Sequence, residues 1–515
     1  MPSPRPASPH AIALSAVASQ VDGTATGPDV EVSGITLSSQ DVVPGDLYAA
    51  LPGANTHGAR YAAGAVAAGA VAVLTDPAGE QELARDGVDV PRVVVPDPRG
   101  VVGLVAREVY GTAEPALGLV GVTGTNGKTT TAYLMSSALT ALGHTTGLIG
   151  TVETRIGDDR VKSLRTTPEA TVLHALLAVM VERGVDYCVM EVSSHALSQH
   201  RVDGVVYDVA LFTNLSQDHL DFHPTMRDYF LAKASLFTPQ RSRRGIVCVD
   251  DEWGRELAET SGVPVTTLTS LDGVAADWRL EQGEDPAAFT LSDGATTLSL
   301  RSALPGDFNR VNTAMAALAL MASGITPQDT ERALLVDPHV PGRMERVVPA
   351  RQDPDPSLPL VVVDYAHTPD AVAAALAALR PSTTGALVVV LGAGGDRDRG
   401  KRAAMGRAAA AGADVVVVTD DNPRSEDPAA IRRAVLEGAR DAGTPAELHD
   451  VAGRAAAIDA AVRAAHARGP GSVVAVVGKG HETGQEVAGT VQPFDDRVEA
   501  ARALDAITLE RGGVA

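Results

Sequence analysis

The sequence LGLVGVTGTNGKTTTAYLMSSALTALG, residues 117–143, decides the fold of the chain around it. An apolar run that predicts a strand leads into the glycine-rich loop GTNGKTT and then into a helix-forming stretch. Glycines let the backbone turn tightly, so that successive N–H groups face phosphate oxygens at the helix N-terminus. Lys128 supplies a cation for the β- and γ-phosphates, and Thr129 offers its hydroxyl to Mg²⁺. Val122 stands where the strict motif has its first glycine, but the context still predicts ATP binding by Gly124, Thr125, Asn126, Gly127, Lys128, Thr129 and Thr130.

Strand and helix signals alternate on both sides of this loop. The runs DYCVMEVSS (186–194), YDVALFTNLS (207–216) and RGIVCVDD (244–251) predict further strands of a mainly parallel sheet with helices on both faces. Boundary signals lie at YGTAEP (110–115) and VPARQDPDPSLP (348–359). We therefore expect an α/β protein of three domains: a small N-terminal α/β domain (1–112), a central P-loop-type ATPase domain (113–347) and a Rossmann-like C-terminal domain (348–515).

Composition excludes several classes of protein. The 515 residues include 43 Lys and Arg against 64 Asp and Glu, and this net charge of -21 disfavours nucleic-acid or anionic-membrane binding. With 45% hydrophobic residues the chain has material for several cores, and its two cysteines, Cys188 and Cys248, fit a reducing compartment. The longest apolar stretch (62–74) is too short to span a bilayer. We expect a soluble cytoplasmic monomer with small-molecule partners, no nucleic acid and no membrane insertion.

Polar residues follow two strands of the predicted central sheet. Glu191 ends the strand YCVMEV, where a carboxylate following a P-loop can ligate Mg²⁺, although it can also be a merely solvated strand end. The segment NLSQDHLDFH (214–223) holds two histidines and two aspartates after the next strand. It suggests a second cation or phosphate contact, or only a capped turn.

Lys233 lies on an apolar helix face. In MRDYFLAKASLF (226–237), helical spacing places it with Tyr229, Phe230, Leu236 and Phe237. Burial lowers a lysine pKa, so one interpretation is an unprotonated amine fit to be modified or to act in a site. The alternative is a lysine that snorkels to solvent.

Four charged loops follow strands late in the chain. They are DYAH (364–367), GDRDRGKR (395–402), DDNPR (420–424) and GKGHE (478–482). Because open α/β sheets bind ligands at the carboxyl ends of their strands, these loops predict a site at one sheet edge. Their mixed charges favour a zwitterionic small molecule.

These blocks, in this order, resemble the Mur ligase family, the ATP-dependent amide-bond ligases of peptidoglycan precursor synthesis. The resemblance covers nearly the whole chain and includes TTPE (166–169), EVSSHAL (191–197), GDFNRVN (306–312) and PGRMERV (341–347) besides the blocks above. Folylpolyglutamate synthases share the P-loop and fold but lack the DNPR and GGDRDRGKR pattern.

The resemblance implies roles for individual residues. Lys128, Lys233, His219 and Glu191 are the implied catalytic residues, and Mg²⁺ is held by Thr129, Glu191, His219 and Lys233 as N6-carboxylysine. The nucleotide also contacts Asn312, Arg343 and Asp364. The implied contacts of the UDP-sugar dipeptide are Leu37, Ser39, Thr166, Thr167, Ser193, Gln199 and Arg201. Those of the incoming amino acid are Arg397, Asp421, Asn422, Pro423, Arg424, Gly478 and Glu482, with Arg424 and Arg397 on carboxylates and Asn422 and Glu482 on the distal ammonium.

The implied reaction is phosphoryl transfer from ATP to the D-glutamyl side-chain carboxylate, followed by attack of an amine on the acyl phosphate. We expect addition of meso-2,6-diaminopimelate to UDP-N-acetylmuramoyl-L-alanyl-D-glutamate, with L-lysine as the alternative amino acid, and closure of the C-terminal domain over the central one. A P-loop kinase and a nucleotide-regulated binding protein without chemistry remain the other hypotheses.

Overall fold

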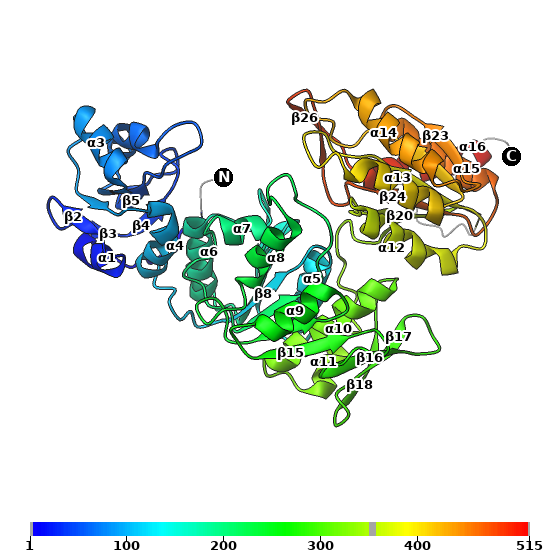
Figure 1. Cartoon of the computed structure of the whole chain (residues 1–515), viewed down its shortest axis with the longest axis horizontal. Helices are drawn as coiled ribbons and strands as arrows, with labels where there is room; N and C mark the ends of the chain where they lie inside the picture. The colour runs from blue at the N-terminus through cyan, green and yellow to red at the C-terminus, as the bar shows by residue number, and fades with distance from the viewer. Residues whose placement is uncertain (1–3, 350–356, 513–515) are drawn as a thin grey trace.

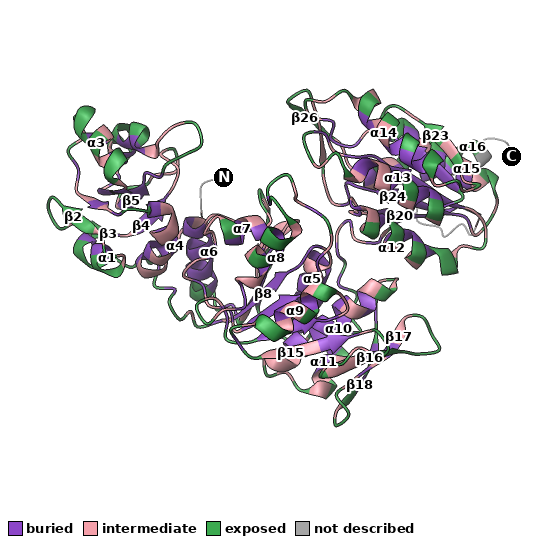
Figure 2. Ribbon diagram, in the orientation of Figure 1, coloured by how far each residue is buried: buried purple, intermediate pink, exposed green. Residues whose placement is uncertain are grey.

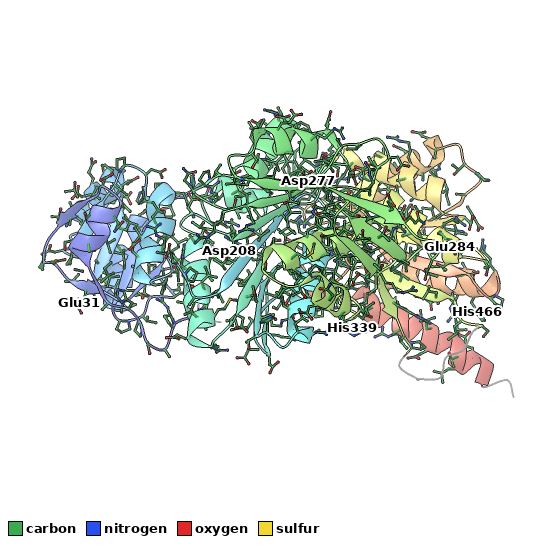
Figure 3. All side chains as sticks on the ribbon, turned by 90° about the horizontal axis from the view of Figure 1, so that it is seen from below. Glu31, Asp208, Asp277, Glu284, His339 and His466 are labelled. Atoms are coloured by element: carbon green, nitrogen blue, oxygen red, sulfur yellow. The ribbon has the colours of Figure 1, made fainter. Side chains whose placement is uncertain are left out.

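The computed structural model describes residues 4–349 and 357–512, which form three sheet-based bodies in chain order along the long axis of the molecule (Figures 1 and 3). The predicted second boundary therefore lies partly outside the described residues. None of the helices in these two ranges combines the length and the apolar character needed to cross a membrane.

The N-terminal body is a five-stranded sheet in the order β2-β7-β6-β5-β4, parallel except for β2 against β7. Its helix α4 packs against α6 of the central body. The strands are β2 (Thr24–Thr26), β4 (Gly34–Thr36), β5 (Asp46–Ala49), β6 (Ala72–Thr75) and β7 (Arg92–Val94), beside the pair β1 (Ile12–Ala13) and β3 (Glu31–Val32). The helices are α1 (Leu14–Gln20), α2 (Ala62–Ala67), α3 (Pro77–Arg85) and α4 (Pro98–Val109), with the 3₁₀ turn η1 (Gly58–Tyr61).

The central sheet runs in the order β11-β10-β9-β12-β8-β13-β14-β15-β16-β17-β18, with the P-loop strand β8 inside it. Strands from β9 to β16 in this order are parallel, and antiparallel hairpins extend both edges. The strands are β8 (Gly118–Thr123), β9 (Thr146–Ile149), β10 (Glu153–Ile156), β11 (Asp159–Lys162), β12 (Tyr187–Glu191), β13 (Val209–Phe212), β14 (Gly245–Cys248), β15 (Val265–Thr269), β16 (Trp278–Gln282), β17 (Ala288–Ser292) and β18 (Thr297–Arg301). The helices are α5 (Lys128–Ala141), α6 (Ala170–Glu182), α7 (Ser194–Ser198), α8 (Met226–Ala234), α9 (Glu252–Thr260), α10 (Asp307–Ala322) and α11 (Pro327–Ala333).

Side chains that alternate along the strands of this sheet pack into two separate hydrophobic cores, one on each face. Val120 and Val122 pack with α5, α10 and α11 on one face, whereas Leu119 packs with α6, α8 and α9 on the other. The inner strands β8, β9, β12, β13 and β14 are accordingly buried along almost their whole length (Figure 2). The prediction of a mainly parallel sheet covered on both faces is confirmed.

The C-terminal sheet has the order β19-β20-β24-β21-β22-β23 and is parallel except at β19. Strand β19 pairs with β20 although it precedes residue 348, where the sequence placed the start of this domain. The strands are β19 (Glu345–Val347), β20 (Leu360–Asp364), β21 (Leu387–Leu391), β22 (Val415–Val418), β23 (Glu447–Asp450) and β24 (Val473–Val477), with the separate hairpin β25 (Gly484–Val487) and β26 (Thr490–Pro493). The helices are α12 (Pro369–Leu379), α13 (Lys401–Gly412), α14 (Pro428–Asp441), α15 (Arg454–Ala467) and α16 (Asp496–Gly512), with the 3₁₀ turn η2 (Arg380–Ser382).

Candidate functional site

The P-loop joins β8 to α5 through two glycines in conformations that other residues rarely adopt. Gly124 has φ +141° and Gly127 has φ +86°, and a Cβ at Gly127 would collide with the side chain of Asn312. Asn214 braces the loop, since its carbonyl and side-chain oxygens accept hydrogen bonds from the backbone N–H groups of Thr125 (2.9 Å) and Asn126 (3.0 Å). The loop is thus held open at a helix N-terminus, which favours anions.

Lys128 begins α5 and folds back over the loop. Its Nζ donates to the carbonyl oxygens of Gly124 (3.0 Å) and Thr125 (2.8 Å), and burial lowers its pKa. The ammonium group therefore lies over the phosphate-binding turn, and a bound phosphate would provide the counter-charge that burial demands.

Thr129 and Glu191 meet beside the P-loop. The Thr129 hydroxyl donates to Glu191 Oε2 at 2.9 Å, and Arg343 Nη2 donates to the same hydroxyl oxygen at 3.1 Å. Glu191 also accepts from the Thr151 backbone N–H (2.7 Å) and hydroxyl (3.0 Å). Sequence reasoning missed Thr151, although its position just after β9 is the signal that selected Glu191 after β12.

These oxygens fit a magnesium ion. Mg²⁺ prefers one or two carboxylates together with phosphate and water oxygens rather than a cage of side chains. Among the described residues no group of three or more His, Cys, Asp or Glu side chains is arranged to hold a metal. The Lys233 amine becomes an oxygen donor only as a carbamate.

Lys233 is buried, with 1% of its surface exposed, so the interpretation as a snorkelling lysine is wrong. Its Nζ donates to the carbonyl oxygen of Gly124 at 2.7 Å and lies 4.5 Å from the centre of the Tyr229 ring. Burial, with the nearby Lys128 charge, holds the Lys233 pKa well below its usual value. The desolvated amine expected from helical spacing is confirmed, and it touches the P-loop itself.

The segment 214–223 is more than a capped turn, because it joins the central and C-terminal bodies. Asp218 Oδ2 lies 3.6 Å from His367 Nε2, and its Oδ1 lies 3.5 Å from Lys401 Nζ. Burial opposes its charge, but the nearby side chains of His367, His219 and Lys401 hold the Asp218 pKa well below its usual value. The neighbouring His219 has its pKa lowered to about 3 by burial, and its ring contacts that of His195 at 4.8 Å.

A cleft of about 610 Å³ lies where these elements converge. It is lined by the P-loop, by residues after β12 and β13, by the start of α10, and by Arg343 and the β20–α12 loop. The sequence-predicted residues that line it are Thr125, Asn126, Gly127, Lys128, Thr129, Thr130, Thr166, Glu191, Ser193, His219, Asn312, Arg343 and Asp364. Phe308 and Tyr365 also line it, and Arg343 stacks over the Tyr365 ring at 4.3 Å.

The predicted dipeptide contacts divide into two groups. Thr167 donates to the Glu191 carbonyl at 2.8 Å and accepts from the Ser193 N–H, while the hydroxyls of Thr166 and Thr151 lie 3.0 Å apart. Nearby, Arg201 donates to Gln199 and lies 3.1 Å from Glu169. Leu37 instead packs on the N-terminal core. Within the described residues, no hydrogen bond or ion pair joins Leu37 or Ser39 to the predicted dipeptide contacts of the central body.

The predicted amino-acid contacts gather around Arg424, at the carboxyl ends of β21, β22 and β24. Arg424 Nη1 donates to the Gly395 carbonyl at 2.7 Å, and its Nε lies 3.3 Å from a Glu486 oxygen. A Cβ placed on Gly394 would lie 3.1 Å from Arg424 Nη1 and 3.7 Å from Arg397 Cγ, so both arginines flank one turn. Arg397 also reaches Asp221 of the central body at 3.5 Å.

Two loops complete this cluster of predicted amino-acid contacts, which is called the amino-acid pocket below. Asp421 accepts from the Asn422 N–H at 2.7 Å, and a Cβ on Gly478 would lie 2.6 Å from Asp421 Oδ2, so these loops are in contact. Asn422 Nδ2 donates to Glu482 at 2.9 Å. Asn422 Oδ1, the atom that the predicted contact with the substrate ammonium would use, accepts from Lys479 Nζ (2.9 Å) and the Glu486 N–H (3.0 Å).

Comparison with known proteins bears on the whole chain. Three family models match in order: "Mur ligase family, catalytic domain" over residues 31–110, "Mur ligase middle domain" over 122–321 and "Mur ligase, glutamate ligase domain" over 342–480. The UDP-N-acetylmuramoyl-L-alanyl-D-glutamate–2,6-diaminopimelate ligase of Streptomyces avermitilis is 52% identical over 97% of this chain and 98% of its own. The UDP-N-acetylmuramyl-tripeptide synthetase of Leifsonia xyli is 48% identical over 92% of each chain.

A solved structure extends the likeness to three dimensions. The structure of a UDP-N-acetylmuramoyl-L-alanyl-D-glutamate–2,6-diaminopimelate ligase is 30% identical, with a TM-score of 0.65 over 97% of this chain and 100% of that one. Sequence, fold and the P-loop cleft therefore agree. The chain belongs to the Mur ligase family of ATP-dependent, amide-bond-forming ligases.

Proposed function

We propose that this ligase adds meso-2,6-diaminopimelate to UDP-N-acetylmuramoyl-L-alanyl-D-glutamate during peptidoglycan precursor synthesis. The observation that carries the choice of amino acid is Arg424, which lies beside Arg397 in a mixed-charge cluster of loops that also holds Asn422 and Glu482. Diaminopimelate carries a carboxylate and an ammonium at each end, whereas lysine lacks the distal carboxylate. The activity named for the Streptomyces relative supports the same choice.

The cleft between the central and C-terminal bodies is the proposed reaction site. ATP phosphates bind the P-loop N–H groups and Lys128, and Arg343 and Asn312 border the nucleotide. Thr129 and Glu191, with His219 and a carboxylated Lys233, are the residues that would hold Mg²⁺. The ion supplies charge neutralisation between the phosphate and carboxylate reactants. The remaining sequence-predicted contacts are proposed binders of the dipeptide and the amino acid.

The first chemical step is transfer of the γ-phosphoryl group to the D-glutamyl side-chain carboxylate. Both reactants are anions, so cations that converge on them lower the barrier. The amino group of diaminopimelate then attacks the acyl carbon, loses a proton and expels phosphate, which leaves an amide. Asp218 holds His367 and Lys401 of the C-terminal body against the central one, which brings the amino-acid pocket toward the P-loop.

The cellular compartment and the oligomeric state are also proposals. Both nucleotide substrates are soluble and phosphorylated, so we propose that the enzyme acts in the cytoplasm. We propose separately that it is a monomer. Sedimentation of the purified chain at assay concentration checks the oligomeric state.

The test of the function is release of ADP and phosphate with the UDP-muramoyl dipeptide and either diaminopimelate or L-lysine. We expect phosphate release only with an amine acceptor present, and a strong preference for diaminopimelate. A phosphorylated product that accumulates without an acceptor would indicate a kinase, and no turnover with any substrate would indicate a binding protein. A preference for lysine would refute the assignment of the amino acid.

A further inference from the structure

Lys479 is a fully buried lysine beside the amino-acid pocket, and the reaction above gives it no role. Its side chain is 0% exposed, and its Nζ donates to Asn422 Oδ1 at 2.9 Å and to Glu482 Oε2 at 2.8 Å. Both partners are proposed contacts of the incoming amino acid. We propose that Lys479 is a positioning residue that sets which atoms of this pocket donate and which accept hydrogen bonds, an inference that rests on the proposed function.

The first consequence concerns the side chain of Asn422. Two groups reach one of its terminal atoms, Lys479 Nζ and the Glu486 N–H, and both can only donate. That atom must therefore be the oxygen, and its two lone pairs are used. Asn422 Nδ2 gives one hydrogen to Glu482 and keeps one for a ligand. Asn422 thus presents an N–H group, which suits a carboxylate and not an ammonium.

The second consequence concerns Glu482. Both Lys479 Nζ and Asn422 Nδ2 reach its Oε2, and no described residue donates a hydrogen bond to its Oε1. The Glu482 side chain is 32% exposed and so remains accessible to a ligand. Oε1 is then the acceptor for a substrate ammonium. The pocket is divided into a carboxylate side, with Arg424 and Asn422, and an ammonium side at Glu482, which matches the zwitterionic end of diaminopimelate.

A purely structural role for Lys479 is the competing explanation. Arg454, however, already anchors the base of the same loop, because its Nη2 donates to the Val477 carbonyl at 2.9 Å. Its guanidinium also pairs with Asp496 at 2.7 Å, and both of these side chains are 0% exposed. The loop that carries Lys479 is therefore held by a second buried cation, so loss of the lysine should change the polarity of the pocket more than the fold of the loop.

The experiment compares two amino acids that differ only in the group that Glu482 is to receive. Diaminopimelate and 2-aminopimelate, which lacks the distal amino group, are assayed with wild type and with Lys479→Met. A charge-assisted hydrogen-bond pair is lost, so we expect kcat/KM for diaminopimelate to fall about 10-fold or more, mainly through KM. For 2-aminopimelate the fall should be under about 3-fold, so the ratio between the two substrates shrinks, while the KM for ATP stays unchanged.

The control variant is Arg463→Met, which removes an ion pair with Glu510 on the outer surface of the same domain. It should leave both substrates unaffected. Equal losses for the two amino acids in Lys479→Met, or an unchanged ratio, would overturn the proposal in favour of a structural brace. If wild type does not use diaminopimelate at all, the proposed function fails instead, so the two failures are distinct.

A double variant keeps the test valid if Lys479→Met folds poorly. Lys479→Met combined with Glu482→Gln removes both charges, so that no unpaired buried charge is left. Because Lys479 is proposed to act on the ammonium through Glu482, the double variant should have the same substrate ratio as Glu482→Gln alone. A further independent loss in the double variant would contradict this pathway.

Discussion

Replacement of Arg424 by alanine should remove the preference for diaminopimelate over lysine. The guanidinium is oriented by the Gly395 carbonyl through Nη1 and by Glu486 beside Nε, which leaves N–H groups free for a carboxylate. A planar guanidinium can pair with a carboxylate through two parallel N–H···O bonds. Lysine has no distal carboxylate and so gains nothing from this residue.

The magnitude follows from the burial of the side chain. A hydrogen bond between charged groups contributes about 1.5–3 kcal/mol, and the lower value applies because Arg424 is 24% exposed. Two such bonds give about 3 kcal/mol, which corresponds to about 10²-fold in kcat/KM for diaminopimelate. The change for lysine should stay within about 3-fold, and the KM for ATP should not move.

The assay is steady-state ADP release with each amino acid at saturating ATP and dipeptide. Arg433→Ala provides a matched control, because this arginine lies exposed on the neighbouring helix α14. It should behave as wild type with both amino acids. If Arg424→Ala lowers kcat/KM equally for diaminopimelate and lysine, the guanidinium does not read the distal carboxylate and the reasoning is wrong.

Three further predictions concern Lys128 of the P-loop, the buried Lys233, and His174 of α6. Lys128→Ala should lower kcat about 10²-fold or more, since a cation is lost where charge builds up; near-normal turnover at saturating ATP would contradict the P-loop assignment. Lys233→Ala should lose most activity with an unchanged circular dichroism spectrum and regain part of it with added short carboxylates, whereas full activity without them would exclude a carbamate. Burial lowers the pKa of His174 to about 4, and its ring nitrogens lie 2.6 Å from the Thr112 hydroxyl and 3.1 Å from the Asp203 carbonyl. Because the folded state favours the neutral ring, the shift adds about 3 kcal/mol to the free energy of unfolding above pH 6.5, and this gain is lost as the pH falls towards 4. His174→Gln should therefore show a smaller drop in Tm between pH 6.5 and 4 than wild type. An equal drop in both proteins would refute this.

Local sequence was sufficient to predict the parallel central sheet and the phosphate-binding loop. Both depend on interactions between residues near in the chain: alternating apolar runs make strands, and glycines at 124 and 127 permit the turn before α5. Helical spacing likewise predicted the burial of Lys233, because residues three and four apart share one face of α8. The contact of Lys233 with the Gly124 carbonyl was not predictable, since it joins residues 109 positions apart.

The sequence by itself therefore determined the fold class, the P-loop and the residue types of each loop, because these follow from short-range periodicity and turn chemistry. Only the tertiary structure decided how the loops combine. It placed Asp218 within reach of His367 and Lys401 of another body, and it put Lys479 beside Asn422, where the lysine amine donates to the Oδ1 of that amide. The direction of a hydrogen bond depends on all the donors that surround an atom, and these come from segments of the chain that only folding brings together.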